Sequence, residues 1–297
     1  MGLTRFFPYS AVTALIYGSL DVAGGFYRIP ATFVTSHGYG GMMVATIPFL
    51  IGIWDQSVNG KIRLLALLGT AAALIGVLLS ATRLNFAIGV VLVGVAIWNG
   101  RMKASRRAVF ALLIVGMMVL ALKNERLTRF KSLSDSDYVE ERISGSVNRG
   151  FLEILIEYPL GNGLGGGGTS IPYFLQGLVR NPISMENEYA RILSEQGVIG
   201  LLLWIGFLVW FFSRFKAVFG KGPWATGRRL ILVLTISELI TGLIGTGMLT
   251  AIPGTAMLLL GIGFVATPMR SEATEKRRLG ATPALVPQRG YRPVPSL

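Results

Sequence analysis

The sequence has no cysteine and a single histidine, His37, among its 297 residues. The absence of cysteine excludes disulfide bonds and thiolate metal centres, and one histidine cannot form a histidine metal cluster. Any chemistry must therefore use arginine, aspartate, glutamate or hydroxyl side chains, or His37 itself. An imidazole suits acid–base catalysis, although a lone histidine is more often a structural hydrogen-bonding residue.

Charged residues are also scarce: they make up 14% of the chain, against about 25% in a typical soluble domain. Hydrophobic residues make up 52%, and apolar runs long enough to cross about 30 Å of hydrocarbon recur along the chain. The eight runs lie at about residues 8–26, 39–54, 64–81, 84–98, 108–122, 198–213, 230–250 and 252–267. The first run lacks a small-residue cleavage site, so we expect a retained span and not a signal peptide. These runs predict an all-α integral membrane protein with about eight transmembrane helices.

The net charge of +13 would suit a nucleic-acid partner, but the distribution of the basic residues argues against one. Basic residues concentrate in alternate loops, at Arg5, 61–63, 101–107, 214–229 and 270–292. The positive-inside rule places these loops and both termini in the cytoplasm. The long loop 123–197 then lies outside, and acidic and basic residues nearly balance in it. The basicity therefore indicates membrane topology, and we expect no nucleic-acid partner.

The predicted chain has four parts: a five-span membrane segment (1–122), an outer loop (123–197), a three-span membrane segment (198–267) and a cytoplasmic tail (268–297). The tail is rich in proline and arginine and has little to bury, so we expect it to be disordered. The large loop between spans five and six is predicted to be helical and periplasmic.

The outer loop contains two predicted helices separated by a glycine-rich stretch. The first places Phe151, Ile154, Leu155 and Tyr158 on one helical stripe and ends at Pro159. GNGLGGGG follows; it lacks the lysine and hydroxyl residue of a phosphate-binding loop, and this favours a structural turn over a phosphate cradle. The second helix is predicted from Met185 to Gln196, with Gly197 ending it or bending it into the next span. Its charged residues Glu188, Arg191 and Glu195 are predicted to pair or to face water.

Arg83, in the segment SATRLNF, lies between two apolar runs at the predicted outer edge of the membrane. An arginine there is costly, so it either faces a polar cavity or extends to the interface from a helix end. The predicted outer face also carries Arg28, Arg142, Arg149 and Glu186. Loop arginines commonly pair with neighbouring glutamates. Several arginines facing one carboxylate would nevertheless suit a diphosphate substrate and a hydroxyl acceptor, because guanidinium groups bind phosphate oxygens and a carboxylate accepts a proton.

Three segments together resemble the O-antigen ligase and polymerase superfamily, the bacterial membrane proteins that join lipid-linked glycans. These segments are ATR after a span, NRGFLEILIEYPLGNGLG in the outer loop, and ENEYARILSEQGVIGLL running into a span. Upstream, YRIPATFVTSHGYGGMMVATIPFL is similar to the family's arginine, small-residue link and span. The resemblance implies a glycosyltransferase of the bacterial inner membrane that uses undecaprenyl-diphosphate glycan donors without a metal or other cofactor. The acceptor would be a glycan or the lipid-A core.

The resemblance also implies roles for individual residues. Arg83 matches an arginine expected to hold the donor diphosphate, and Arg149 or Arg142 matches a second phosphate-binding arginine. Glu186 and Asn187 stand where the family has His-Asn, and the family's histidine is thought to activate the acceptor hydroxyl. A carboxylate can serve as the general base of an inverting displacement in its place. The predicted diphosphate ligands also include Arg28, and His37 and Asn187 are predicted to be auxiliary residues.

Three alternatives stay open at this stage. The enzyme could be a repeat-unit polymerase or a ligase, since Glu186 departs from the ligase pattern. A transporter or flippase would use charges inside the spans, where Asp21 and Glu238 qualify. A non-catalytic partner of a polysaccharide assembly complex is the third alternative, because family members have several more upstream spans and we expect this chain to be an N-terminally shortened member.

Overall fold

The computed structural model describes residues 33, 36–98, 104–123, 151–165, 167, 187–219, 224–245, 247–249 and 251–267. These residues form eight α-helices and one short 3-10 helix, and they contain no β-strand. The predicted all-α fold is therefore confirmed for this part of the chain.

The helices follow the apolar runs of the sequence. They are α2 (Ser36–Gln56), α3 (Gly60–Ser80), α4 (Arg83–Trp98), α5 (Ala104–Lys123), α7 (Phe151–Glu157), α8 (Glu188–Ser213), α9 (Ala225–Thr241) and α10 (Gly254–Ala266), with the 3-10 helix η4 at Phe215–Phe219. Seven of the eight predicted runs coincide with one of these helices, and the first run, 8–26, lies outside the described residues. The run predicted at 230–250 is wrong at its end, because α9 stops at Thr241.

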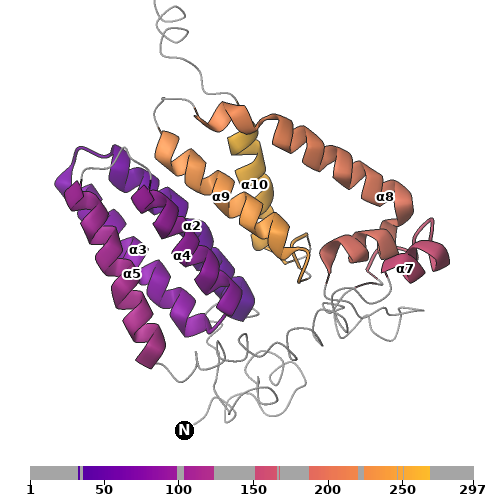
Figure 1. Cartoon of the computed structure of the whole chain (residues 1–297), viewed down its shortest axis with the longest axis horizontal. Coiled ribbons are helices and arrows are strands. Elements are labelled where there is room, and N and C mark those ends of the chain that lie inside the picture. The colour runs from indigo at the N-terminus through magenta and orange to yellow at the C-terminus, as the bar shows by residue number, and fades with distance from the viewer. Residues whose placement is uncertain are drawn as a thin grey trace, which may run out of the picture.

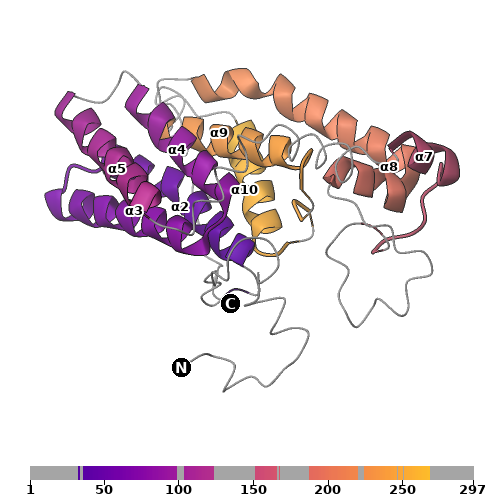
Figure 2. The same cartoon turned by 60° about the horizontal axis from the view of Figure 1, so that its bottom comes forward.

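Helices α2, α3, α4 and α5 pack side by side and form one half of the molecule (Figures 1 and 2). Their core consists of fully or nearly fully buried aliphatic and aromatic side chains, among them Val44, Ile47, Ile51, Leu74, Val77, Leu92, Val93 and Phe110. The ring of Trp54 meets that of Phe110 edge to face, with centroids 4.9 Å apart. The apolar faces of neighbouring helices therefore cover one another, as in a helix bundle.

Helix α9 joins this bundle to the rest of the molecule, because it packs against α2, α4 and α10. Two glycines permit the close approach of α2 and α9: a Cβ atom on Gly52 would lie 3.2 Å from the Cα of Gly227. Thr226 also donates a hydrogen bond of 2.7 Å to Asp55. Helix α8 lies beyond α9 and α10 on the far side from α2–α5 (Figure 1).

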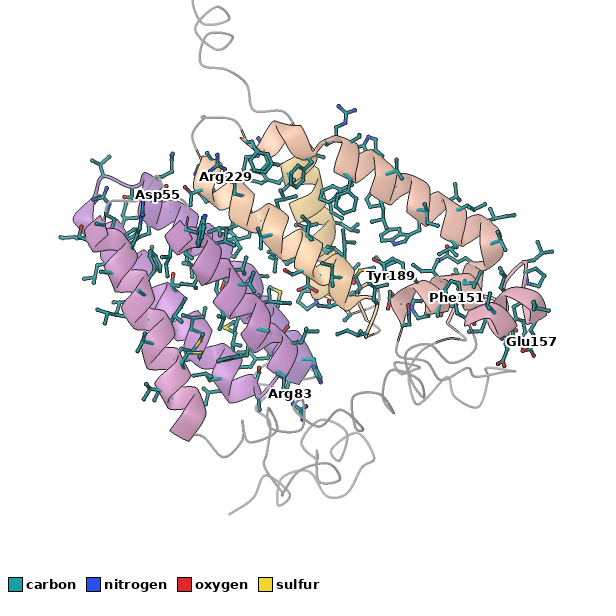
Figure 3. The ribbon with its side chains drawn as sticks, in the orientation of Figure 1. Asp55, Arg83, Phe151, Glu157, Tyr189 and Arg229 are labelled. Atoms are coloured by element: carbon teal, nitrogen blue, oxygen red, sulfur yellow. The ribbon has the colours of Figure 1, made fainter. Side chains whose placement is uncertain are left out.

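The helices run in alternating directions, so their ends form two opposite sides. Asp55 and Arg229 lie together at one end, and Arg83 lies at the other (Figure 3). Buried Arg228 donates hydrogen bonds to the carbonyls of Val265 and Thr267, which places the last turn of α10 beside the first turn of α9. Together these contacts define the Asp55 end and the Arg83 end of the molecule.

Two of the described helices, α3 and α8, are long and apolar enough to cross a membrane. Helices α4 and α10 and the central part of α5 are apolar but shorter than the roughly 20 residues that a full crossing needs. Many large apolar side chains point away from the protein, for example Leu65 of α3 and Leu203 of α8. A membrane protein is thus supported in outline, and eight spans stay a prediction.

Candidate functional site

Arg83 begins α4 directly after a tight turn. Helix α3 ends at Ala81, which takes a left-handed backbone conformation with φ of 50°, and the Ala81 amide donates to the Leu78 carbonyl. The hydroxyls of Ser80 and Thr82 lie 2.8 Å apart and are buried. Arg83 itself is partly exposed. This polar turn thus places Arg83 at one end of the helices, and its position at the outer edge of a membrane stays a prediction.

The first turns of α2 press against this polar turn. The Asn85 side chain donates a hydrogen bond of 3.3 Å to the His37 carbonyl, so the structure brings His37 and the start of α4 together. The His37 side chain is exposed. The amino-terminal ends of α2 and α4 are therefore neighbours, and each contributes a partial positive charge to the region of Arg83.

Gly40 makes this contact possible, because a Cβ atom there would lie 2.5 Å from the Ser80 hydroxyl and 2.6 Å from that of Thr82. We expect Gly40→Ala to destabilise the protein by about 1–3 kcal/mol through overpacking. The matched control is Gly41→Ala, because Gly41 has no atom within 4 Å of such a Cβ. Thermal unfolding in detergent compares the two variants, and equal melting temperatures would contradict the packing described here.

The start of α8 is the second polar region at the Arg83 end. Asn187 caps the helix: its side-chain oxygen accepts hydrogen bonds from the amides of Tyr189, at 2.9 Å, and Ala190, at 3.1 Å. The Tyr189 hydroxyl donates to the Leu239 carbonyl of α9 at 2.8 Å. The Glu188 amide donates to the Gly242 carbonyl, also at 2.8 Å. The first turn of α8 is therefore fixed to the last turn of α9.

Three charged side chains of α8 form a buried cluster, which we call the Arg191 cluster: Glu188, Arg191 and Glu195. Glu188 is completely buried, and the other two are 6% exposed. Arg191 donates from Nε and Nη2 to Oε1 of Glu188 and from Nη1 to Oε2 of Glu195, the last at 2.5 Å. They pair, which is one of the two predicted alternatives, and they do not face water. Two carboxylates share one guanidinium, so the cluster has a formal charge of −1.

Backbone amides from two loops that are distant in sequence also donate hydrogen bonds to the two carboxylates. Glu188 accepts hydrogen bonds from the amides of Gly247, at 2.7 Å, and Leu249, at 3.2 Å. Glu195 accepts from the amides of Gly165, at 3.1 Å, and Gly167, at 3.3 Å. The glycine-rich stretch thus directs these two amides at a carboxylate of the same chain, which supports the predicted structural turn over a phosphate cradle.

Gly197 bends α8, which is one of the two predicted alternatives. Its φ of 69° and ψ of −167° are not helical, and the break leaves the carbonyls of Ser194 and Glu195 free to accept other donors. The amide of Asn162 donates to the Ser194 carbonyl at 2.7 Å, and the amide of Gly163 donates to the Glu195 carbonyl at 3.2 Å. Residues 159–165, which we call the glycine turn, therefore occupy hydrogen-bonding positions that a continuous helix would use itself.

Gly161 lies closest to this break. Its φ is +88°, and a Cβ atom there would lie 2.5 Å from the Glu195 carbonyl oxygen. Gly163 has a similar φ of +97° but has open space around it. Both alanine variants incur backbone strain, and we expect Gly161→Ala to lose about 1–3 kcal/mol more stability than Gly163→Ala because of the clash. Thermal unfolding of both variants tests this difference, and equal losses would contradict the close approach.

Helix α7 packs along the first turns of α8. Ile154 of α7 lies with Ala190 and Leu193 in a small buried cluster, and Phe151 packs against it. Phe151 lies on the side of α7 that faces Tyr189, whereas Glu157 lies at the outer edge of the molecule (Figure 3). Helix α7, the glycine turn and the start of α8 therefore form one outer unit.

Four of the predicted site residues lie outside the described residues: Arg28, Arg142, Arg149 and Glu186. Arg83 and His37 are positioned by α2, α3 and α4, whereas Asn187 is positioned by α9. The burial of the Arg191 cluster was not predicted, although its spacing of three and four residues places all three side chains on one helical face.

Within the described residues, no three histidine, aspartate or glutamate side chains are grouped so that they could hold a metal ion. Comparison with models of known protein families gives no match, and comparison with curated protein sequences gives none either. The functional assignment therefore rests on the residues themselves and on their arrangement.

Proposed function

We propose that this chain is an integral membrane glycosyltransferase of the O-antigen ligase and polymerase type. It transfers glycan from an undecaprenyl-diphosphate donor to a sugar hydroxyl during assembly of cell-surface polysaccharide. In this proposal the helices form eight spans of the bacterial inner membrane, both termini are cytoplasmic, and loop 123–197 is periplasmic. Arg229 and Arg83 lie at opposite ends of the helices, as a placement of loop 214–229 and Arg83 on opposite sides of the membrane requires (Figure 3).

One observation carries the proposal: Arg83 lies where the amino-terminal ends of α2 and α4 meet, at an end of strongly apolar helices. A guanidinium group and two helix termini together favour a multiply charged anion. A lipid diphosphate presents such an anion at the membrane surface. Arg149 or Arg142, together with Arg28, would supply further positive charge from the outer face.

The start of α8 supports a role for Glu186 as the general base. Glu186 directly precedes Asn187, whose side chain caps α8 and whose neighbours are fixed to α9. The Arg191 cluster ties this turn to the glycine turn and to residues 247–249. A helix start held by three segments provides a fixed point from which a base can act.

The proposed reaction is an inverting displacement. The acceptor hydroxyl oxygen attacks the anomeric carbon, the bond from that carbon to the diphosphate oxygen breaks, and Glu186 takes the hydroxyl proton. Arg83 and a loop arginine stabilise the negative charge that develops on the leaving diphosphate. No metal is required by this scheme, because guanidinium groups supply the positive charge.

The polysaccharide of a strain lacking the gene tests the proposal and separates its two forms. Loss of long chains with single repeats retained indicates a polymerase. Accumulation of lipid-linked polymer indicates a ligase. Loss of the surface polysaccharide with the lipid-linked donor retained on the cytoplasmic side would instead favour a flippase, and an entirely unchanged polysaccharide would contradict a role in its assembly.

A further inference from the structure

Helix α7 has three distinct faces although it is short. Phe151, Ile154 and Leu155 face α8 and are buried or partly buried. Glu153 and Glu157 are exposed, and at a spacing of four residues they share a second face. Leu152 and Ile156, also four residues apart, form the third face. A helix in contact only with water and with the rest of the protein would need only the first two of these faces.

The glycine turn that follows α7 carries two more exposed aliphatic side chains. Leu152, Ile156, Leu160 and Leu164, which we call the α7 apolar row, are between 71% and 81% exposed. Four large aliphatic side chains this exposed in one short segment are unusual for a surface in contact with water alone, and such patches mark interaction sites.

The apolar row adjoins the outward face of α8. The Pro159 carbonyl accepts a hydrogen bond of 2.9 Å from the Val198 amide, so Leu160 lies beside the start of the apolar part of α8. Beyond this point α8 exposes Ile199 at 62% and Leu203 at 72%. Helix α8 is one of the two helices able to cross a membrane. Exposed apolar side chains therefore lie on both sides of this contact, on the candidate span and on the segment that follows α7.

We propose that the α7 apolar row inserts into the outer surface of the lipid bilayer, with Glu153 and Glu157 directed towards water. The contact with α8 favours lipid as the occupant, because acyl chains that surround a span at α8 would also meet a segment bonded to the start of its apolar part. Helix α7 lies beside α8 at the edge of the molecule in both views (Figures 1 and 2). It thereby fixes the outer unit at the depth of the lipid head groups.

This inference rests on the membrane placement given in the proposed function, but its test requires no glycosyl transfer. The chain has no cysteine, so a single nitroxide can be attached at Ile156→Cys without a background signal. Glu157→Cys is the matched control on the neighbouring face, and Leu203→Cys is the lipid reference on α8. Leu152→Cys is a second site on the row should Ile156→Cys fold poorly.

The labelled full-length chain is reconstituted in vesicles of phosphatidylethanolamine and phosphatidylglycerol, and collisions with oxygen and with a water-soluble nickel chelate are measured. We expect the ratio of oxygen to nickel collisions at residue 156 to be at least threefold that at residue 157 and to approach the ratio at residue 203. Equal ratios at 156 and 157 would overturn the proposal. Shielding of residue 156 from both reagents, or dipolar broadening between labels, would also overturn it, because protein would then cover the row.

Discussion

Arg191→Ala is expected to destabilise the protein by about 3–5 kcal/mol, the loss typical when one partner of a buried ion pair is removed. Glu188 is completely buried and Glu195 nearly so. Without the guanidinium, two carboxylates on one helical face would be left with backbone amides alone. The glycine turn should then separate from α8 more readily than in the wild-type protein. Thermal unfolding in detergent, with limited proteolysis between residues 158 and 167, measures both effects.

Two further variants show whether the loss comes from the shared guanidinium. Arg191→Lys keeps the charge but cannot donate to both carboxylates with fork geometry, so its stability should fall between those of wild type and Arg191→Ala. Lys61→Ala removes an exposed positive charge from the first turn of α3 and should change stability by less than about 0.5 kcal/mol. If Arg191→Ala unfolded at the wild-type temperature, the cluster would have no role in holding the loops.

Arg83→Ala is expected to lower the rate of glycan transfer about 10²–10³-fold, the usual effect of removing one donor that stabilises transition-state charge. Arg83→Lys should recover part of the rate, because an ammonium keeps the charge but not the bidentate geometry. Transfer is measured with a lipid-linked donor, and thermal unfolding is recorded for the same preparations. A lower rate at unchanged melting temperature separates phosphate binding from a purely structural role of Arg83.

The opposite end of the molecule provides the control for this prediction. Arg229→Ala removes a guanidinium from the end of the helices occupied by Asp55, where the donor diphosphate does not bind in our proposal (Figure 3). Its rate should stay within about twofold of the wild-type rate. Equal losses from Arg83→Ala and Arg229→Ala would point to a general loss of structure and would contradict the assignment of Arg83.

Most of the helical architecture could be predicted from the sequence, because apolar runs determine which segments are buried away from water. The prediction failed at the end of α9, where the sequence stays apolar after Thr241 but the helix stops. Gly247 takes a φ of +109°, and its amide and that of Leu249 bind the Glu188 carboxylate. This helix end depends on a partner about 60 residues away, so local hydrophobicity could not reveal it.

In the candidate site, too, features set by the local sequence could be predicted, and features set by contacts remote in sequence could not. The bend at Gly197 and the pairing among Glu188, Arg191 and Glu195 were predictable from glycine and from the spacing of charges along a helix. Their burial was not predictable, because the buried carboxylates accept hydrogen bonds from the amides of Gly165, Gly167 and Gly247, which are remote in sequence. Similarly, Arg83 was expected on the outer face, but the contact of the start of α4 with His37 depends on the hydrogen bond from Asn85 to α2.

The central claim is that the chain forms a glycosidic bond, and the direct measurement is transfer by the purified protein in vesicles. The protein is supplied with an undecaprenyl-diphosphate glycan and a glycan acceptor, and products are resolved by mass. We predict a lengthened acceptor, release of undecaprenyl diphosphate, and a loss of about 10²–10⁴-fold in Glu186→Gln, as expected for removal of a general base. Glu186→His should retain more activity than Glu186→Gln. Absence of a lengthened acceptor with the wild-type chain, or an undiminished rate in Glu186→Gln, would contradict the account.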